Sequence, residues 1–184
     1  MEEPKQEKFG IKHLLMLLAS ITISVLIVVF NKQLRDLQQF GYIGIFLLMF
    51  LGNATVLVPV PVLAPLNILL GGIFSSPLLL GLTVGVASSF GELVGYLAGY
   101  SGSGIVKSSK VYKKIELQVE KYGLWTILFL ALIPNPLFDV AGLAAGALGI
   151  KWWKFLIAVT IGKTIRAIVF AYIGYTGSLL ISKG

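Results

Sequence analysis

Apolar residues occur along this chain in long runs that are separated by short polar segments. The apolar runs cover residues 14–30, 41–74, 77–100, 124–150 and 155–181. Runs of about 20 apolar residues are typical of helices that cross a membrane. The pattern therefore predicts an all-α polytopic membrane protein with about three full transmembrane helices, at 14–30, 77–100 and 155–181.

The other two runs each contain a pair of prolines, and the two pairs lie 75 residues apart: Pro59 and Pro61, then Pro134 and Pro136. A proline removes a backbone donor and clashes with the preceding turn, so each pair breaks its helix. Broken backbone inside a bilayer is tolerated only where it is buried in protein or lines a wet cavity. We therefore expect two re-entrant helical hairpins, with one span followed by a buried loop as the alternative for residues 41–74.

The predicted hairpin tips contain asparagines as well as prolines. The amide of Asn67 can form hydrogen bonds with backbone groups that the break leaves unpaired. The tip residues are thus expected to be Pro59, Pro61, Asn67, Pro134, Asn135 and Pro136.

These segments predict a single membrane domain over residues 1–184. Its parts are an N-terminal tail, span and connector (1–39), a first hairpin plus span (41–100), an amphipathic surface segment (101–122) and a second hairpin plus span (124–181). A signal peptide is the alternative for the first run, but no small-residue cleavage motif closes it.

The surface segment has apolar residues at steps of three and four: Val111, Ile115, Val119 and Tyr122. This spacing predicts a helix lying on the membrane surface, and a solvated loop helix is the alternative. Lysines flank the apolar face, and another pair flanks two tryptophans before the last run. The basic residues expected at lipid headgroups are Lys110, Lys113, Lys114, Lys151 and Lys154.

The distribution of basic residues predicts an orientation. With the N-terminus in the cytoplasm and both broken runs re-entrant, ten lysines lie inside and three basic residues lie outside. This division obeys the positive-inside rule. The first hairpin would then enter from outside and the second from inside, which makes the two halves an inverted repeat.

Composition supports a membrane protein and excludes several classes of chemistry. The chain is 57% hydrophobic and 12% charged, and its mean hydropathy is +0.90, which excludes an ordinary soluble domain. It contains no cysteine, which excludes disulfides and thiolate metal sites. We attribute the net charge of +7 to attraction to anionic lipid headgroups, and no nucleic-acid-binding motif is present.

Four ionisable residues lie inside the apolar runs: Glu92, Asp139, Lys163 and Arg166. Each would cost about 2.5–3.5 kcal/mol at the bilayer centre, so mutual pairing is expected. They are either structural ion pairs or a site in which Lys163 or Arg166 meets an anionic headgroup and Glu92 or Asp139 carries a proton. Arg166 is the better partner for a phosphate because a guanidinium can bind it through two hydrogen bonds.

Enzymatic chemistry has little support in the sequence. His13 is the only histidine, and neither G-x-S-x-G nor H-E-x-x-H occurs. We therefore expect a protein that is not an enzyme, with no catalytic residues, no metal and no cofactor.

Three segments resemble one known family. They are PVPVLAPLNILLGGIF, FGELVGYLAGYSGSG with Gly91, Glu92, Tyr96 and Gly99 in place, and LIPNPLFDVAGLAAGALGIKWWKFLIAVTIGKTIR. In this order they resemble the DedA superfamily, also called the VTT or SNARE-associated domain, over about residues 40–178.

The resemblance implies two opposed re-entrant hairpins and movement of lipids across the membrane. Bacterial members are implicated in recycling undecaprenyl phosphate, with a proposed dependence on the proton-motive force, and eukaryotic relatives in scrambling phospholipids. Glu92 would be an essential acid, with Lys163 and Arg166 as the cationic side. Ala131 stands where many members carry an arginine, and Asp139 is a candidate substitute for an acid that is absent after the first prolines.

The expected function is therefore that of a flippase or scramblase that moves phospholipid or polyprenyl-phosphate headgroups across the bilayer, with proton coupling left open. The alternatives are a proton- or ion-coupled transporter of a small soluble solute and a structural membrane protein. The expected location is a prokaryotic plasma membrane with the N-terminus in the cytoplasm, and oligomer formation stays open.

Overall fold

The computed structural model describes residues 40–54, 63–101, 110–134 and 137–183, and the regular structure in these ranges is entirely helical. The helices are α3 (Gly41–Asn53), α4 (Leu63–Gly71), α5 (Pro77–Gly91), α6 (Leu93–Tyr100), α7 (Lys110–Tyr122), α8 (Leu124–Leu132), α9 (Leu137–Ala147) and α10 (Trp152–Lys183). Pro77–Tyr100 and Trp152–Ser182 are long and apolar enough to cross a membrane. The all-α prediction is confirmed, and the predicted first span lies outside the described residues.

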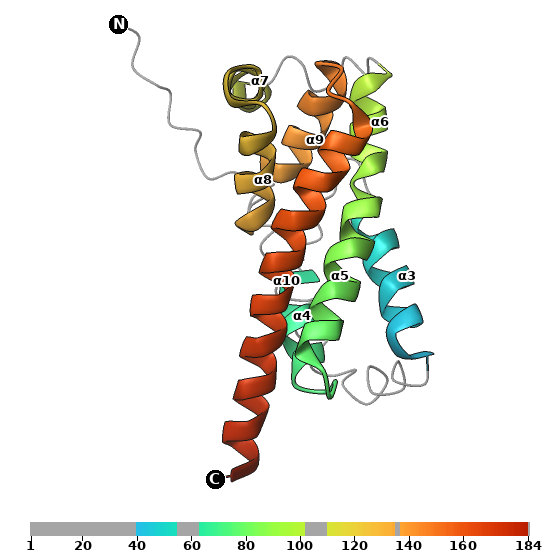
Figure 1. Cartoon of the computed structure of the whole chain (residues 1–184), viewed down its shortest axis with the longest axis vertical. Coiled ribbons are helices and arrows are strands. Elements are labelled where there is room, and N and C mark those ends of the chain that lie inside the picture. The colour runs from blue at the N-terminus through green and yellow to red at the C-terminus, as the bar shows by residue number, and fades with distance from the viewer. Residues whose placement is uncertain (1–39, 55–62, 102–109, 135–136, 184) are drawn as a thin grey trace, which may run out of the picture.

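The first broken run folds back on itself. Gly52, near the end of α3, lies against the side chain of Leu63, which begins α4. At the other end the ring of Tyr42, in the first turn of α3, lies 5.2 Å from the ring of Phe74. The chain therefore reverses between α3 and α4, as Figure 1 shows, while Pro59 and Pro61 lie outside the described residues.

The second broken run also reverses direction. α8 packs alongside the N-terminal half of α10, and the backbone carbonyl of Leu128 lies close to Gly162. α9 then begins beside the middle of α10, where the ring of Phe138 lies 5.0 Å from Lys163 Nζ, and ends just before α10 starts. Pro134 lies in the break between the two helices, and Asn135 and Pro136 lie outside the described residues.

Four close backbone contacts hold the two halves together, and they form two pairs related by the 75-residue offset. In each contact a Cβ added to a glycine would collide with a carbonyl oxygen of the partner helix. The contacts are Gly71 with Ala171, its equivalent Gly146 with Tyr96, Gly174 with Ile68, and its equivalent Gly99 with Leu143. The second helix of each hairpin thus packs on a membrane-spanning segment of the other half. α4 packs on α10, and α9 packs on α6, the second part of the Pro77–Tyr100 segment.

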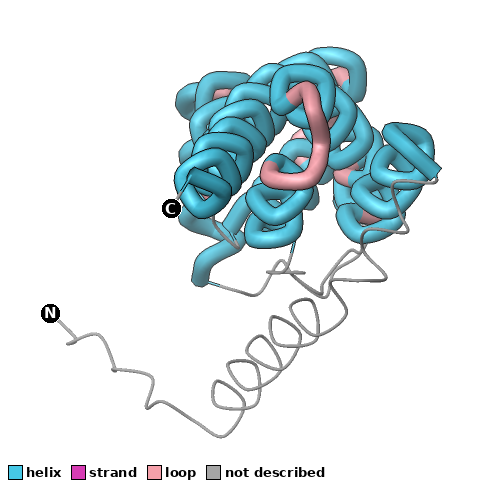
Figure 2. Tube along the Cα trace, turned by 90° about the horizontal axis from the view of Figure 1, so that it is seen from below, coloured by secondary structure: helices cyan, strands magenta, loops and turns pink. Residues whose placement is uncertain are grey.

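The described residues form helices joined by loops and turns (Figure 2). Their apolar interior is divided into two clusters, and the helices of the two clusters lie toward opposite ends of the long axis in Figure 1. One cluster joins α6, α7, α8 and α9 to the first part of α10, where it ends at Val159. The other joins α3, α4 and α5 to the second part of α10, where it begins at Ala167. Between these two positions α10 carries Lys163 and Arg166, so the ionisable residues lie between two hydrophobic cores.

Helix α7 is amphipathic as predicted, but two details of the prediction are wrong. The apolar face packs against α8 and α9, so protein covers it and lipid does not. Tyr112 is buried on that face with Ile115 and Val119, whereas Tyr122 is 56% exposed. Tyr122 is the last helical residue before the turn at Gly123, whose φ is 56°. Burial, together with Glu116, raises the pKa of Tyr112 to about 12.

Candidate functional site

Glu92 and Lys163 form a buried salt bridge between the two halves of the chain. Glu92 lies at the junction of α5 and α6, Lys163 lies in the middle of α10, and they are 5% and 3% exposed. Removing two charges from water costs several kcal/mol per ion, so each must keep a partner and further hydrogen bonds. The expected pairing of an acid with a base is therefore observed between residues 71 positions apart.

Glycines allow the helices that carry this pair to approach closely. Gly85 of α5 lies against Thr164 of α10, and Gly91 lies against Phe50 and Asn53 at the end of α3. A side chain at either glycine would push these helices apart. The end of α3 is consequently held next to the Glu92–Lys163 pair.

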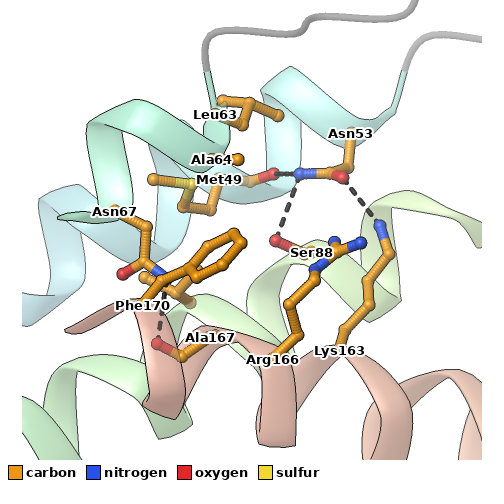
Figure 3. Close-up of a pocket in the computed structure, with 11 residues that line it drawn as sticks. Met49, Asn53, Leu63, Ala64, Asn67, Ser88, Lys163, Arg166, Ala167 and Phe170 are labelled. Carbon is orange, nitrogen blue, oxygen red and sulfur yellow. Dashed lines mark hydrogen bonds between the residues drawn. The ribbon is translucent and has the colours of Figure 1, made fainter. Parts of the chain in front are cut away.

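Asn53 connects Lys163, one member of the ion pair, to the first hairpin (Figure 3). Its Oδ1 accepts a hydrogen bond from Lys163 Nζ at 2.8 Å, and its Nδ2 donates to Ser88 Oγ at 3.1 Å and to the Met49 carbonyl at 2.7 Å. The sequence analysis missed Asn53 and Ser88. Two signals were available: Asn53 is a polar residue inside an apolar run, and Ser88 lies one turn before Glu92 on the same face.

Arg166 lies near the start of α4 and the end of α8. Its Nη1 donates to the carbonyl of Ile133, the residue before Pro134, at 3.4 Å. The same side chain lines a cavity with Leu63 and Ala64, which follow the first break. One half-buried side chain therefore bonds the residue before Pro134 and shares a cavity with the residues that begin α4.

Asp139 lies at the edge of this group, in the first turn of α9. Its carboxylate is half-buried and interacts electrostatically with Glu92 and Lys163, without a salt bridge to any described residue. The four ionisable residues selected from the sequence are thus gathered in one region, with Glu92 and Lys163 in direct contact.

The cavity beside Arg166 has a volume of about 40 Å³. Its polar lining comes from Asn53, Asn67, Ser88, Lys163 and Arg166 (Figure 3). Asn67 was expected to bond backbone groups freed by the break. Its Nδ2 instead donates to the Ala167 carbonyl at 3.0 Å, because α4 packs directly against the middle of α10.

The predicted headgroup-facing lysines lie at one end of the molecule as far as they are described. Lys113 and Lys114 are exposed on α7, and Lys151 and Lys154 are exposed around the start of α10 (Figure 1). Lys154 Nζ lies 5.4 Å from the ring of Trp153, which is also exposed. The side chain of Lys110 lies outside the described residues.

Comparison with known proteins gives a family and partial relatives. A family model described as the VTT domain matches residues 58–176. Vacuole membrane protein KMS1 of Arabidopsis thaliana is 38% identical over 74 residues, which are 40% of this chain and 18% of that protein. Human vacuole membrane protein 1 is 41% identical over 58 residues, 32% of this chain and 14% of that protein. The chain therefore matches less than a fifth of the length of these relatives, and no solved structure matches it.

Proposed function

Because this chain belongs to the VTT-domain family of membrane proteins, we propose that it moves lipids with phosphate-containing headgroups between the two leaflets of a bilayer. The substrates under this proposal are phospholipids or polyprenyl phosphates, and the protein acts as a flippase or scramblase without catalysing a chemical reaction. The membrane proposed is a prokaryotic plasma membrane.

The observation that carries the proposal is the position of Arg166 between two broken helices and two hydrophobic cores. A phosphate crossing a bilayer needs a cationic partner and exclusion from the hydrocarbon. Glu92 balances the charge of Lys163, which leaves the guanidinium of Arg166 to bind a phosphate through two hydrogen bonds. Asp139 and Glu92 are the acids that would carry a proton if transport is coupled to one.

The symmetry-related glycine contacts support two opposed re-entrant hairpins. α3 and α4 meet the rest of the molecule from the end where α5 begins, and α8 and α9 from the end where α10 begins (Figure 1). Inverted repeats of this kind place a substrate site at the midplane, between discontinuous helices. The exposed lysines at the α7 end agree with a cytoplasmic location for that end.

The surroundings of the cavity favour a lipid over a small soluble solute. The residues of α10 on either side of Arg166 include Ile165 and Val169, which are 48% and 50% exposed. In a membrane protein such exposed apolar side chains face acyl chains, so a lipid headgroup can enter sideways while its tails stay in the bilayer. A carrier for a soluble solute would instead need a pocket closed to the bilayer.

Reconstitution into liposomes with leaflet-labelled lipids tests the proposal. The intact chain should move phospholipids across the bilayer faster than empty liposomes, and Arg166→Ala should reduce the rate at least tenfold. Ile165→Ala, a change at the neighbouring exposed position, is the matched control and should stay within about twofold. Absence of movement with several headgroups would exclude the proposed function.

A further inference from the structure

The cavity beside Arg166 is lined by cations and by no acid, as far as the chain is described. Lys163 and Arg166 are the charged residues among its described lining residues. Residues 55–62, which connect α3 to α4, contain no Asp or Glu either. Lys163 is 3% exposed, and its ammonium already contacts Glu92 and Asn53. Arg166 is only half-buried, so it is the charge that a ligand in the cavity meets.

The two acids of the site, Glu92 and Asp139, are not among the residues that line the cavity. Glu92 is paired with Lys163, and Asp139 belongs to α9, in the other hairpin. The side-chain oxygen of Asn53, which does line the cavity, already accepts a hydrogen bond from Lys163. A cation in the cavity would therefore lie near Arg166 without a carboxylate of the described lining to pair with. Like charges repel strongly where the dielectric constant is low.

Ala64 is the position at which the two hairpins differ in this respect. It lies in the first turn of α4, is half-buried, and lines the cavity together with Arg166 (Figure 3). The residue 75 positions later is Asp139, in the first turn of α9. An acid is favoured in the first turn of a helix, where the N–H groups are free. The helix that lines the cavity therefore has a small apolar side chain at a place where a carboxylate would be tolerated.

We propose that the protein selects lipids whose headgroup phosphate has no ammonium attached to it, with Arg166 at the phosphate and Ala64 as the specificity-determining residue. This inference rests on the lipid transport proposed above and names the headgroup class. In ethanolamine and choline headgroups a short linker joins the ammonium to the phosphate, so the ammonium stays near Arg166 whenever the phosphate is bound there. Ala64 gives the wall no negative charge that would offset this repulsion.

Two lipids that differ only by the ammonium provide the test. Phosphatidylethanol and phosphatidylethanolamine have the same phosphodiester and the same linker carbons. In liposomes that contain the intact chain and a trace of either tail-labelled lipid, phosphatidylethanol should cross about tenfold faster, because its headgroup brings no second cation to Arg166. The quantity to be measured is the ratio of the two rates, after the rate in empty liposomes has been subtracted from each.

Variants at Ala64 then assign the preference to the cavity wall. Ala64→Asp adds a carboxylate and should lower the ratio at least threefold, whereas the isosteric but neutral Ala64→Asn should leave it within about twofold. If Ala64→Asp alone moves neither lipid and unfolds at the same temperature as Ala64→Asn, its carboxylate occupies Arg166 in place of the phosphate, which also supports the assignment. A ratio that Ala64→Asp leaves unchanged would overturn the assignment.

The outcomes separate this inference from the function on which it rests. Equal rates for the two lipids with the unaltered chain would overturn selection against the ammonium while transport stands. Movement of neither lipid by the unaltered chain would instead remove the proposed function. The comparison with the unaltered chain does not depend on whether any variant folds.

Discussion

The two halves of the molecule share matched glycine contacts but carry different chemistry at positions 75 residues apart. The backbone contacts of the first half with the second are repeated 75 residues later with the roles exchanged. At the same offset, every ionisable residue of the site corresponds to a small residue in the other half: Glu92 to Ala167, Lys163 to Ser88, Arg166 to Gly91 and Asp139 to Ala64. At each of these positions, one half therefore has an ionisable side chain and the other half has a small side chain.

This asymmetry has a physical reason. Two copies of each charge at the centre would bring like charges close together in a medium of low dielectric constant. A single Glu92 and a single Lys163 can pair across the two halves at a smaller desolvation cost. Matched glycine contacts with unmatched side chains thus concentrate one ion pair and one further arginine between two apolar cores.

The regions around the two breaks also differ. The cavity lined by Asn53 and Asn67 lies between the helices that flank the first break, α3 and α4, and the helices α5 and α10. On the side of the second break, α9 packs against α6 and α8, and α7 covers it with Ile115 and Val119. The helices of the first hairpin therefore line the cavity with polar groups, while the second hairpin contributes the Ile133 carbonyl that Arg166 contacts.

The largest expected effect comes from removing one member of the ion pair that links the halves. Lys163→Met leaves Glu92 buried without its partner and should reduce the free energy of unfolding by about 3–5 kcal/mol. Thermal unfolding in detergent, or urea unfolding in mixed micelles, measures this loss. The double change Glu92→Leu with Lys163→Met should recover most of the stability, because neither member of the pair is left as a buried charge without its partner.

The same double variant separates structure from transport. If the pair serves only to hold helices together, the recovered protein will move lipid like the unaltered chain. If the pair belongs to the transport site, movement in liposomes will stay at the level of empty liposomes although the fold is restored. If stability does not recover in the double variant, the attraction between Glu92 and Lys163 does more than offset the cost of removing the two charges from water. That outcome would contradict this account of the pair.

The next effect tests whether the two halves are truly equivalent. Gly71→Ala and Gly146→Ala each place a Cβ against a carbonyl oxygen of the other half, and each should cost about 1–3 kcal/mol of unfolding free energy. Gly95→Ala is the control, because an added Cβ there meets nothing within 4 Å. That change should stabilise the helix by about 0.5–1 kcal/mol. A large loss of stability at only one of these two glycines would show that the two contacts are not equivalent.

Much of this arrangement could be predicted from local sequence patterns. The helix break at Pro134, the two long apolar segments and the four ionisable residues follow from proline chemistry, hydropathy and the cost of burying charge. These signals are local, because each depends on residues within one or two helical turns. They indicate that Glu92 and Lys163 need partners, and Arg166 is expected near Lys163 because it lies three residues further along one helix.

What could not be predicted depends on contacts between distant segments. Asn53 joins the site only because α3 packs against α5 through Gly91, and the target of Asn67 lies 100 residues away. Likewise, periodicity showed that α7 is amphipathic, but it does not show whether lipid or α9 covers the apolar face. The exchange of Tyr112 for Tyr122 on that face depends on where the helix ends, which is the least certain feature of any periodic pattern.

The smallest expected effect concerns a hydrogen bond that only one half possesses. Tyr96 donates its hydroxyl proton to the Ile150 carbonyl and so ties α6 to the end of the second hairpin. Ala171 occupies the equivalent position and has no side-chain donor, so the first hairpin lacks this connection. Tyr96→Phe makes the halves alike in this respect and should cost about 0.5–1.5 kcal/mol, since the ring keeps its packing against Phe155. Hydrogen exchange should show faster opening of the amides around Ile150 and unchanged protection around Gly72, and a uniform loss of protection in both hairpins would show that the two halves do not open separately.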